Sequence, residues 1–161
     1  MIRNIPFGKP LIDESEKEAV IDVLNNTQLV HGQRSKEFEK IFSNFIGGGY
    51  CATTSSCTAA LHLSYINMGI YGSEVEVIVP ALSHVASAHS VEYNGAKPVF
   101  VDVDLTTGNI DVNLIENHIS EKTKAICVVH YAGLPVDMNK VLKLANKYNL
   151  KIVEDCALGL G

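Results

Sequence analysis

The sequence predicts an α/β fold with three layers, in which helices flank both faces of a mostly parallel β-sheet. From about residue 50 onward, short apolar segments alternate with amphipathic ones, the order expected of parallel strands joined by crossover helices. The short segments are apolar at consecutive positions, as at 77–79 and 125–129, so both faces of the sheet should be covered. Polar residues follow several of these segments, at the edge where open α/β sheets bind ligands.

The composition is that of a mildly acidic globular protein. Its 161 residues are enough for one α/β domain with a hydrophobic core; 47% of them are apolar and 19% are charged. The net charge of −5 and the absence of a basic patch argue against a nucleic-acid partner. No apolar run is long enough to cross a bilayer, and residues 1–6 lack the apolar core of a signal peptide. We therefore expect a cytoplasmic protein without a membrane partner.

The first fifty residues predict an extended arm and two helices. The arm, residues 1–13, contains two prolines, and a helix is expected from 14 to 25. A second helix is expected from 35 to 46, because four large apolar residues recur there at helical spacing. These are Phe38, Ile41, Phe42 and Phe45. The three glycines at 47–49 should end this helix.

The remainder of the chain predicts alternating strands and helices. Asp111 and Asp137 each stand at the start of an amphipathic segment, where an aspartate caps the free N–H groups of a helix. The expected strands are residues 50–54, 75–79, 98–103, 124–130 and 150–155. The expected helices are residues 55–68, 84–94, 111–119 and 137–148.

Asp155 is the candidate residue around which the site is organised. It ends the last expected strand, at the ligand-binding edge of the sheet. A carboxylate there can pair with a protonated ring nitrogen, which the chemistry of pyridoxal phosphate requires. It can equally cap the next turn or pair with a surface lysine. Position alone leaves these alternatives open.

Residues 55–58 (Ser-Ser-Cys-Thr) follow a strand and open a helix. The N–H groups of a helix N-terminus bind phosphate, and hydroxyls there can add hydrogen bonds. A simple N-cap explains the same residues. Cys57 adds a third alternative, because a thiol at a helix N-terminus can have a lowered pKa and act as a nucleophile. His84, just past another strand end, can stack on a flat cofactor or merely begin a helix.

Several other polar residues also lie at strand ends. Asp102 and Asp104 flank one residue and can do acid–base work or simply turn the chain. His130 and Tyr131 are candidate cleft residues without an assigned role. We expect no metal site, because the six histidines and four cysteines show no zinc-binding spacing. The cysteines are expected to be free thiols, with Cys51, Cys127 and Cys156 buried.

Eight ordered segments together resemble a known family. They include an opening arm, a phosphate-binding turn and an E-D-A-A segment. The matched segments are residues 5–10 (IPFGKP), 32–39 (GQRSKEFE), 56–63 (SCTAALHL), 77–80 (VIVP), 95–102 (GAKPVFVD), 129–130 (VH), 135–138 (PVDM) and 154–157 (EDCA). On these segments the chain resembles the DegT/DnrJ/EryC1/StrS sugar aminotransferases, which are fold-type I pyridoxal phosphate enzymes.

The resemblance implies roles for four residues. Cys57 and Thr58 would hold the cofactor phosphate, His84 would stack on the pyridine ring, and Asp155 would pair with the ring nitrogen. It also implies an incomplete aspartate aminotransferase-like large domain, a homodimer, glutamate as amino donor and a nucleoside-diphosphate keto sugar as substrate. Both polysaccharide and antibiotic sugar biosynthesis are compatible with the family.

The sequence departs from the family pattern in three places. Cys57 replaces a glycine, and Leu158 stands where many members carry Gln or His. In the family, the lysine that forms the Schiff base with the cofactor lies downstream of the E-D-A-A segment, and none of the eleven lysines here lies in that place. We therefore expect an arm and helix over 1–34, an incomplete cofactor domain over 35–161, no small C-terminal domain, and no catalysis by this chain alone.

Three further functions remain open at this point. A non-catalytic subunit or remnant could pair with a full-length homologue, since family members are usually dimers with sites near the subunit interface. A thiol enzyme in which Cys57 is the nucleophile is the second. A dehydratase variant, in which histidine replaces the lysine, is also compatible with the resemblance.

Overall fold

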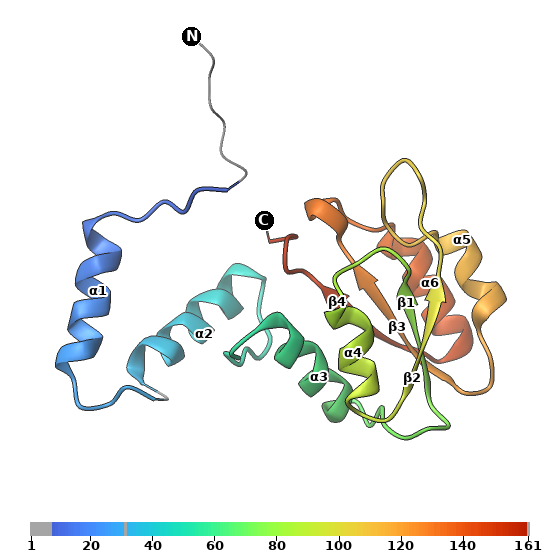
Figure 1. Ribbon diagram of the computed structural model, residues 1–161, viewed down its shortest axis with the longest axis horizontal. Coiled ribbons are helices and arrows are strands. Elements are labelled where there is room, and N and C mark those ends of the chain that lie inside the picture. The colour runs from blue at the N-terminus through green and yellow to red at the C-terminus, as the bar shows by residue number, and fades with distance from the viewer. Residues whose placement is uncertain (1–7, 31, 161) are drawn as a thin grey trace, which may run out of the picture. The chain divides into compact units, whose positions relative to one another are not determined.

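The computed structural model describes residues 8–30 and 32–160 (Figure 1). The chain divides into two compact units, residues 1–53 and 54–161. Among the described residues, no helix combines the length and the apolar character needed to cross a bilayer. Residues 1–7 of the predicted opening arm lie outside the described residues. The last residue, Gly161, also lies outside them.

The first unit is built from two helices. Helix α1 (Glu14–Asn25) begins at a capping box, in which the Asp13 side chain accepts from the Ser15 amide and Glu16 binds the Asp13 amide. Helix α2 (Gln33–Phe45) presents the predicted aromatic stripe, with the rings of Phe38 and Phe42 5.7 Å apart. Neither helix contains a buried residue.

The segment after α2 corrects one prediction. The three glycines at 47–49 end the helix in the positive-φ region, as expected. Residues 50–54, predicted as a strand, form none. Instead, the backbone N–H and hydroxyl of Thr53 donate to Glu39 on α2, at 2.8 and 2.9 Å. The prediction was wrong because the β-propensity of Tyr, Cys and Thr makes a strand only beside a hydrogen-bonded neighbour, and this segment has none among the described strands.

The second unit contains a four-stranded parallel sheet in the order β2-β1-β3-β4. Its strands are β1 (Glu76–Pro80), β2 (Lys97–Val101), β3 (Thr123–Val129) and β4 (Lys151–Asp155). All three strand pairs are parallel, so the carboxyl ends of the four strands meet at one edge. The predicted α/β class with a parallel sheet is therefore confirmed.

Helices cover both faces of this sheet and complete the three layers (Figure 1). Helices α3 (Cys57–Asn67) and α4 (Ala86–Glu92) pack on one face, together with Val77, Val79 and Val153. Helices α5 (Val112–Ile115) and α6 (Met138–Tyr148) pack on the other. Short 3-10 turns follow α5 at Glu116–His118 and β3 at Tyr131–Gly133.

The alternation of side chains along β4 separates two carboxylates. Val153 belongs to the core on the α3 face, whereas Ile152 packs with the core on the α6 face. Because successive strand residues point to opposite faces, Asp155 faces α3 and Glu154 faces the other side. Asp155 is only 6% exposed.

Ile126 in the central strand β3 tests this packing. Its side chain is fully buried in the core on the α6 face. We expect Ile126→Ala to lower the free energy of unfolding by about 2–4 kcal/mol, because the lost methyl groups leave a cavity between two layers. Urea unfolding followed by circular dichroism measures this.

Leu105 supplies the matched control, because its side chain is fully exposed. Leu105→Ala should change the free energy of unfolding by less than about 0.5 kcal/mol. Equal losses in the two variants would contradict the described core.

The predicted domain boundary between residues 34 and 35 differs from the division into compact units. Helix α2 belongs to the first unit, which runs to Thr53. The boundary at 34 refers to the cofactor domain of a whole enzyme, so it stays a prediction.

Candidate functional site

Asp155 lies at the carboxyl end of β4, where it meets the first turn of α3. The thiol of Cys57 donates a hydrogen bond to its Oδ1 at 3.4 Å, and the Ala157 amide donates to the same oxygen at 3.0 Å. Oδ2 receives no hydrogen bond from any described residue. The carboxylate is thus fixed through one oxygen and retains the other for a ligand.

The N-terminus of α3 has unused hydrogen-bond donors. The Ser56 side chain caps the Ala59 amide at 3.1 Å, and the Ala60 amide bonds the Ser56 carbonyl. Neither the amides of Cys57 and Thr58 nor the Thr58 hydroxyl has an acceptor among the described residues. Ser56 is therefore the N-cap, and the two residues after it keep donors that suit an anion.

Cys57 lies at a helix N-terminus, where a thiol can have a lowered pKa, but its pKa is raised instead. Burial, and then the charge and hydrogen bond of Asp155, raise the pKa of the Cys57 thiol to about 11. The negative carboxylate at 3.4 Å outweighs the positive end of the helix dipole. This geometry disfavours the thiol-enzyme hypothesis.

The reactivity of Cys57 should show this shift. With a pKa of about 11, only about one thiol in a few thousand is ionised at pH 7.5. Iodoacetamide should therefore modify Cys57 far more slowly than glutathione in the same tube, and the rate should rise about tenfold per pH unit up to about pH 11. Mass mapping of the Cys57 peptide measures it. Alkylation at the glutathione rate at pH 7.5 would contradict the arrangement.

His84 lies on the same edge of the sheet but is not joined to Asp155. It follows β1, and β3 stands between β1 and β4. The ring is exposed, and its Nδ1 accepts a hydrogen bond from the Ala86 amide at 3.2 Å. No hydrogen bond or ion pair of the described residues connects His84 with Cys57 or Asp155. Its predicted stacking role stays a prediction.

The aspartates after β2 form a turn. Asp104 Oδ1 accepts from the amides of Thr106 and Thr107, and these backbone bonds lower the pKa of Asp104. Asp102 Oδ1 accepts from the next amide, and Val103 forms an isolated antiparallel bridge with Ile110. Of the two alternatives raised for this pair, the structure supports the turn.

The cysteines are free thiols, as predicted, but they differ in burial. Cys127 is fully buried, and burial raises its pKa to about 12. Cys51 is only partly buried and Cys156 is exposed, so the prediction of burial was wrong for Cys156. Cys156 directly follows β4, which ends at Asp155.

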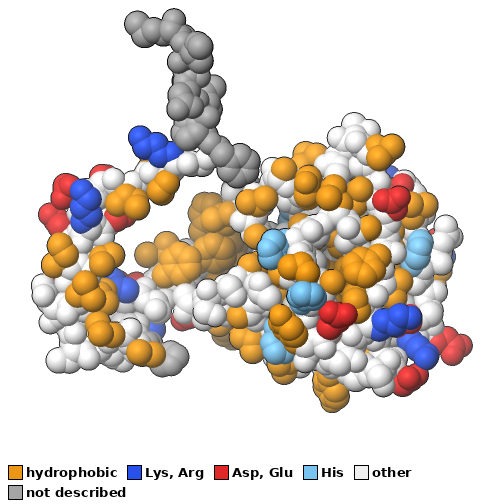
Figure 2. All heavy atoms as spheres, in the orientation of Figure 1, with side chains coloured by type: hydrophobic (Ala, Val, Ile, Leu, Met, Phe, Trp, Pro, Cys, Tyr) orange, Lys and Arg blue, Asp and Glu red, His pale blue; other side chains and the backbone are white. Residues whose placement is uncertain are grey.

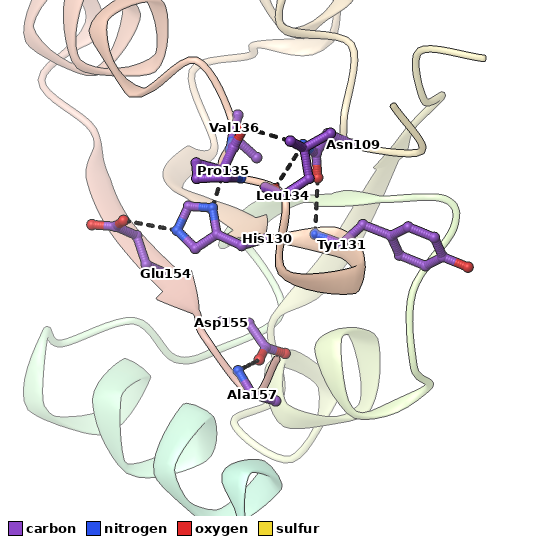
Figure 3. A network of polar contacts seen from close by, with 9 residues as sticks. All are labelled: Asn109, His130, Tyr131, Leu134, Pro135, Val136, Glu154, Asp155 and Ala157. Atoms are coloured by element: carbon purple, nitrogen blue, oxygen red, sulfur yellow. Dashed lines mark hydrogen bonds and ion pairs between the residues drawn. The ribbon is translucent and has the colours of Figure 1, made fainter. Parts of the chain in front are cut away.

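Sequence reasoning missed a polar network around His130 (Figure 3). The Asn109 amide nitrogen donates to the carbonyls of Leu134 and Pro135, and its oxygen accepts from the Tyr131 amide. His130 was noted as a cleft residue only. Asn109 carries no sequence signal beyond its turn, because its partners are more than twenty residues away.

Two surface cavities of about 530 Å³ each lie away from these residues. One is lined by the α1–α2 loop region and the other by residues 119–124 and 148–150. Neither is lined by Cys57, Thr58, His84 or Asp155. The candidate site is therefore an open edge of the second unit and not one of these cavities.

Comparison with known proteins gives a consistent result. Residues 10–161 match the DegT/DnrJ/EryC1/StrS aminotransferase family. Two relatives are each 40% identical to this chain. UDP-4-amino-4-deoxy-L-arabinose--oxoglutarate aminotransferase of Shewanella sediminis matches over 98% of this chain and 40% of its own length. GDP-perosamine synthase of Escherichia coli O157:H7 matches over 99% of this chain and 44% of its own length.

Solved structures agree with the sequence comparison. Spr1654 from Streptococcus pneumoniae, in its PLP-form, superposes with a TM-score of 0.89 at 33% identity, over 96% of this chain and 43% of that one. The predicted cofactor, pyridoxal phosphate, is thereby confirmed for the family. The chain spans about two fifths of the length of the curated relatives it matches.

Proposed function

Because this chain belongs to the DegT/DnrJ/EryC1/StrS aminotransferase family, we propose that it is the N-terminal, cofactor-binding part of a pyridoxal phosphate-dependent nucleotide-sugar aminotransferase. The reaction is amino transfer from glutamate to a keto sugar carried on a nucleoside diphosphate. The two relatives are named for a UDP sugar and for a GDP-linked sugar, so the proposal leaves the nucleotide open.

One observation carries the proposal: a buried carboxylate lies beside a helix N-terminus with unused donors. Thr58 and the backbone N–H of Cys57 would bind the cofactor phosphate, and Asp155 would bind the protonated ring nitrogen through Oδ2. His84 would stack on the ring from the loop after β1. When bound, the cofactor supplies an electron-withdrawing ring that stabilises charge at the substrate carbon.

The residues present suit this group, although Cys57 replaces the family glycine. Its side chain points toward Asp155, as the 3.4 Å contact requires, so its thiol is engaged there while its backbone N–H has no partner. Cys57 therefore holds Asp155 Oδ1 in place as well as presenting a backbone donor. The first effect favours binding of the protonated cofactor ring next to Oδ2, and the second favours binding of the phosphate at the N-terminus of α3.

Pyridoxamine 5′-phosphate is the probe that tests this proposal, because it binds without a covalent bond to lysine. We expect saturable binding to this chain, followed by fluorescence, with clear preference over pyridoxamine, which lacks the phosphate. Thr58→Val should reduce that preference by removing one donor to the phosphate.

Thr106→Val is the matched control, since Thr106 is an exposed threonine of the 104–108 turn. It should leave the preference unchanged. Binding of pyridoxamine as tight as that of its phosphate by the unmodified chain would refute the phosphate site.

The dimer predicted for this family is also proposed for this chain, with a second copy as the partner. Large apolar side chains remain exposed on α1 and α2 (Figure 2), including Val20, Leu24, Phe38, Ile41 and Phe45. Exposed apolar area of this kind is typical of surfaces covered by another chain. Light scattering coupled to size-exclusion chromatography should give twice the chain mass. A stable monomer at high concentration would contradict this.

A further inference from the structure

His130 joins the loop after β3 to the end of β4 (Figure 3). Its amide N–H donates to the Asp155 carbonyl at 3.2 Å, its ring Nδ1 accepts from the Val136 amide at 3.1 Å, and its Nε2 lies 3.1 Å from Glu154 Oε2. The residue is only 8% exposed. One buried side chain thus contacts both the loop after β3 and the strand that carries Asp155.

These contacts fix the tautomer of the ring. A backbone N–H can only donate, so Nδ1 must carry a lone pair, and the neutral ring then bears its proton on Nε2. That proton points at Glu154 Oε2, which accepts it. His130 is therefore assigned as the Nε2–H tautomer, with every polar atom of the ring satisfied.

The tautomer decides against a cation site at the same place. His130, Glu154 and Cys156 offer ligand atoms that all lie within 4.8 Å of one another. A metal ligand must present a lone pair, and the Nε2 atom that faces the carboxylate carries a proton. The His130–Glu154 hydrogen bond therefore connects the loop after β3 with β4 and does not form part of a metal site.

The segment after Asp155 closes over the same ring. A Cβ at Gly159 would lie 3.1 Å from the His130 Cβ, and one at Gly133 would lie 2.8 Å from the Leu158 carbonyl oxygen. The loop after β3 and residues 156–159 are thus in close contact, and Gly159 packs against the His130 side chain. Asp155 stands at the start of this joined region, and the Ala157 amide within it fixes its Oδ1.

We propose that His130 is a positioning residue: as the neutral Nε2–H tautomer it ties Glu154 and the 130–136 loop together, and so fixes the Asp155 carboxylate on the opposite face of β4. This inference deepens the proposed function, and rests on it only for the identity of the ligand. His130 touches no ligand itself and acts through the backbone of β4.

Hydrogen exchange of the Ala157 amide tests the inference without any cofactor. His130→Asn keeps an acceptor near the Val136 amide but is too short to reach Glu154. We expect it to lower the protection of the Ala157 amide about tenfold, while the Val128 amide in β3 keeps its protection. Glu154→Gln retains a side-chain oxygen that accepts from Nε2 and should keep protection within about twofold, whereas Glu154→Ala should behave as His130→Asn.

The matched control is His118→Asn, because His118 is exposed and, among the described residues, its ring bonds only the Leu114 carbonyl. This variant should leave the hydrogen-exchange protection of the Ala157 amide unchanged. Nitrogen-15 NMR of the imidazole should show a bare Nδ1 and a protonated Nε2 at neutral pH.

Two results would overturn the inference: an Nδ1–H tautomer, or unchanged Ala157 protection in His130→Asn. Pyridoxamine 5′-phosphate titrations separate the inference from the proposed function. If the unmodified chain fails to bind this probe, the proposed function fails, while exchange at Ala157 still decides the role of His130. If the chain binds it, His130→Asn should weaken binding about tenfold and Glu154→Gln should not.

Discussion

A protein consisting of residues 1–161 alone is expected to show no transaminase turnover, even when saturated with pyridoxal phosphate. The reason is the placement of lysines in the second unit. Lys151 begins β4, the strand that Asp155 ends, so the two residues lie about 13 Å apart along the strand. Lys97 likewise begins β2, and Lys124 lies next to the start of β3. These three lysines therefore lie toward the amino edge, opposite the candidate site.

The remaining lysines of this unit serve elsewhere. Lys122 pairs with Glu74, Lys140 and Lys147 on α6 pair with carboxylates on the other face of the sheet, and Lys143 lies on the same helix. None of the described lysines of the second unit is therefore placed to bond the proposed cofactor covalently or to move a proton at the substrate carbon.

Formation of 2-oxoglutarate from glutamate, in the presence of cofactor and a nucleotide keto sugar, measures turnover. A full-length member of the family assayed in parallel is the positive control. Borohydride reduction followed by peptide mapping adds a second readout, and we expect no pyridoxyl-lysine in a stoichiometric amount. Turnover above background, or stoichiometric labelling of one lysine, would contradict the prediction.

Asp155→Ala is expected to weaken binding of pyridoxamine 5′-phosphate about 10- to 100-fold. A hydrogen bond to a charged group contributes about 1.5–3 kcal/mol, and the ring cation loses its counter-charge as well. Asp155→Asn keeps the shape and should lose most of the same affinity, because the amide cannot supply the negative charge. Fluorescence titration at fixed ionic strength measures both variants.

Asp102→Asn provides the matched control. Asp102 also lies at the carboxyl edge, just past β2, and is exposed, so this variant makes the same change of charge at the same edge. Its affinity should stay within about twofold of the unmodified chain. Equal losses in Asp102→Asn and Asp155→Asn would mean that net charge, and not the position of Asp155, controls binding.

The helices with N-capping residues in their own sequence were the best predicted part of the fold. Helix α1 has the predicted bounds, because Asp13 and Glu16 form a capping box within the helix itself. Asp137 likewise begins α6 as expected, with its side chain accepting from the Lys140 amide. Such contacts span three or four residues, so a local pattern contains all the information they need.

Features that depend on distant partners were predicted less well. Residues 50–54 have strand-forming side chains but no neighbouring strand, and their polar contact is to Glu39 on α2. The roles of Asn109 and His130 depend on partners brought together by the sheet. For the candidate site, Asp155 lies at the end of a strand as expected, whereas Cys57 was expected to follow a strand, 50–54, that does not form. The contact between the Cys57 thiol and the Asp155 carboxylate depends on side-chain geometry and had no local sequence signal.

The opposite orientations of Glu154 and Asp155 make the register of β4 a determinant of the site. Val129 is paired with Asp155 and Val128 with Glu154. A slip of β4 by a single residue toward its carboxyl end would exchange the two carboxylates between the helix layers. Asp155 would then face the His130 side, and Glu154, one methylene longer, would replace it beside Cys57. An insertion or deletion between α6 and β4 that changed this register would therefore alter the proposed contact with the cofactor, although it lies at the far end of the strand.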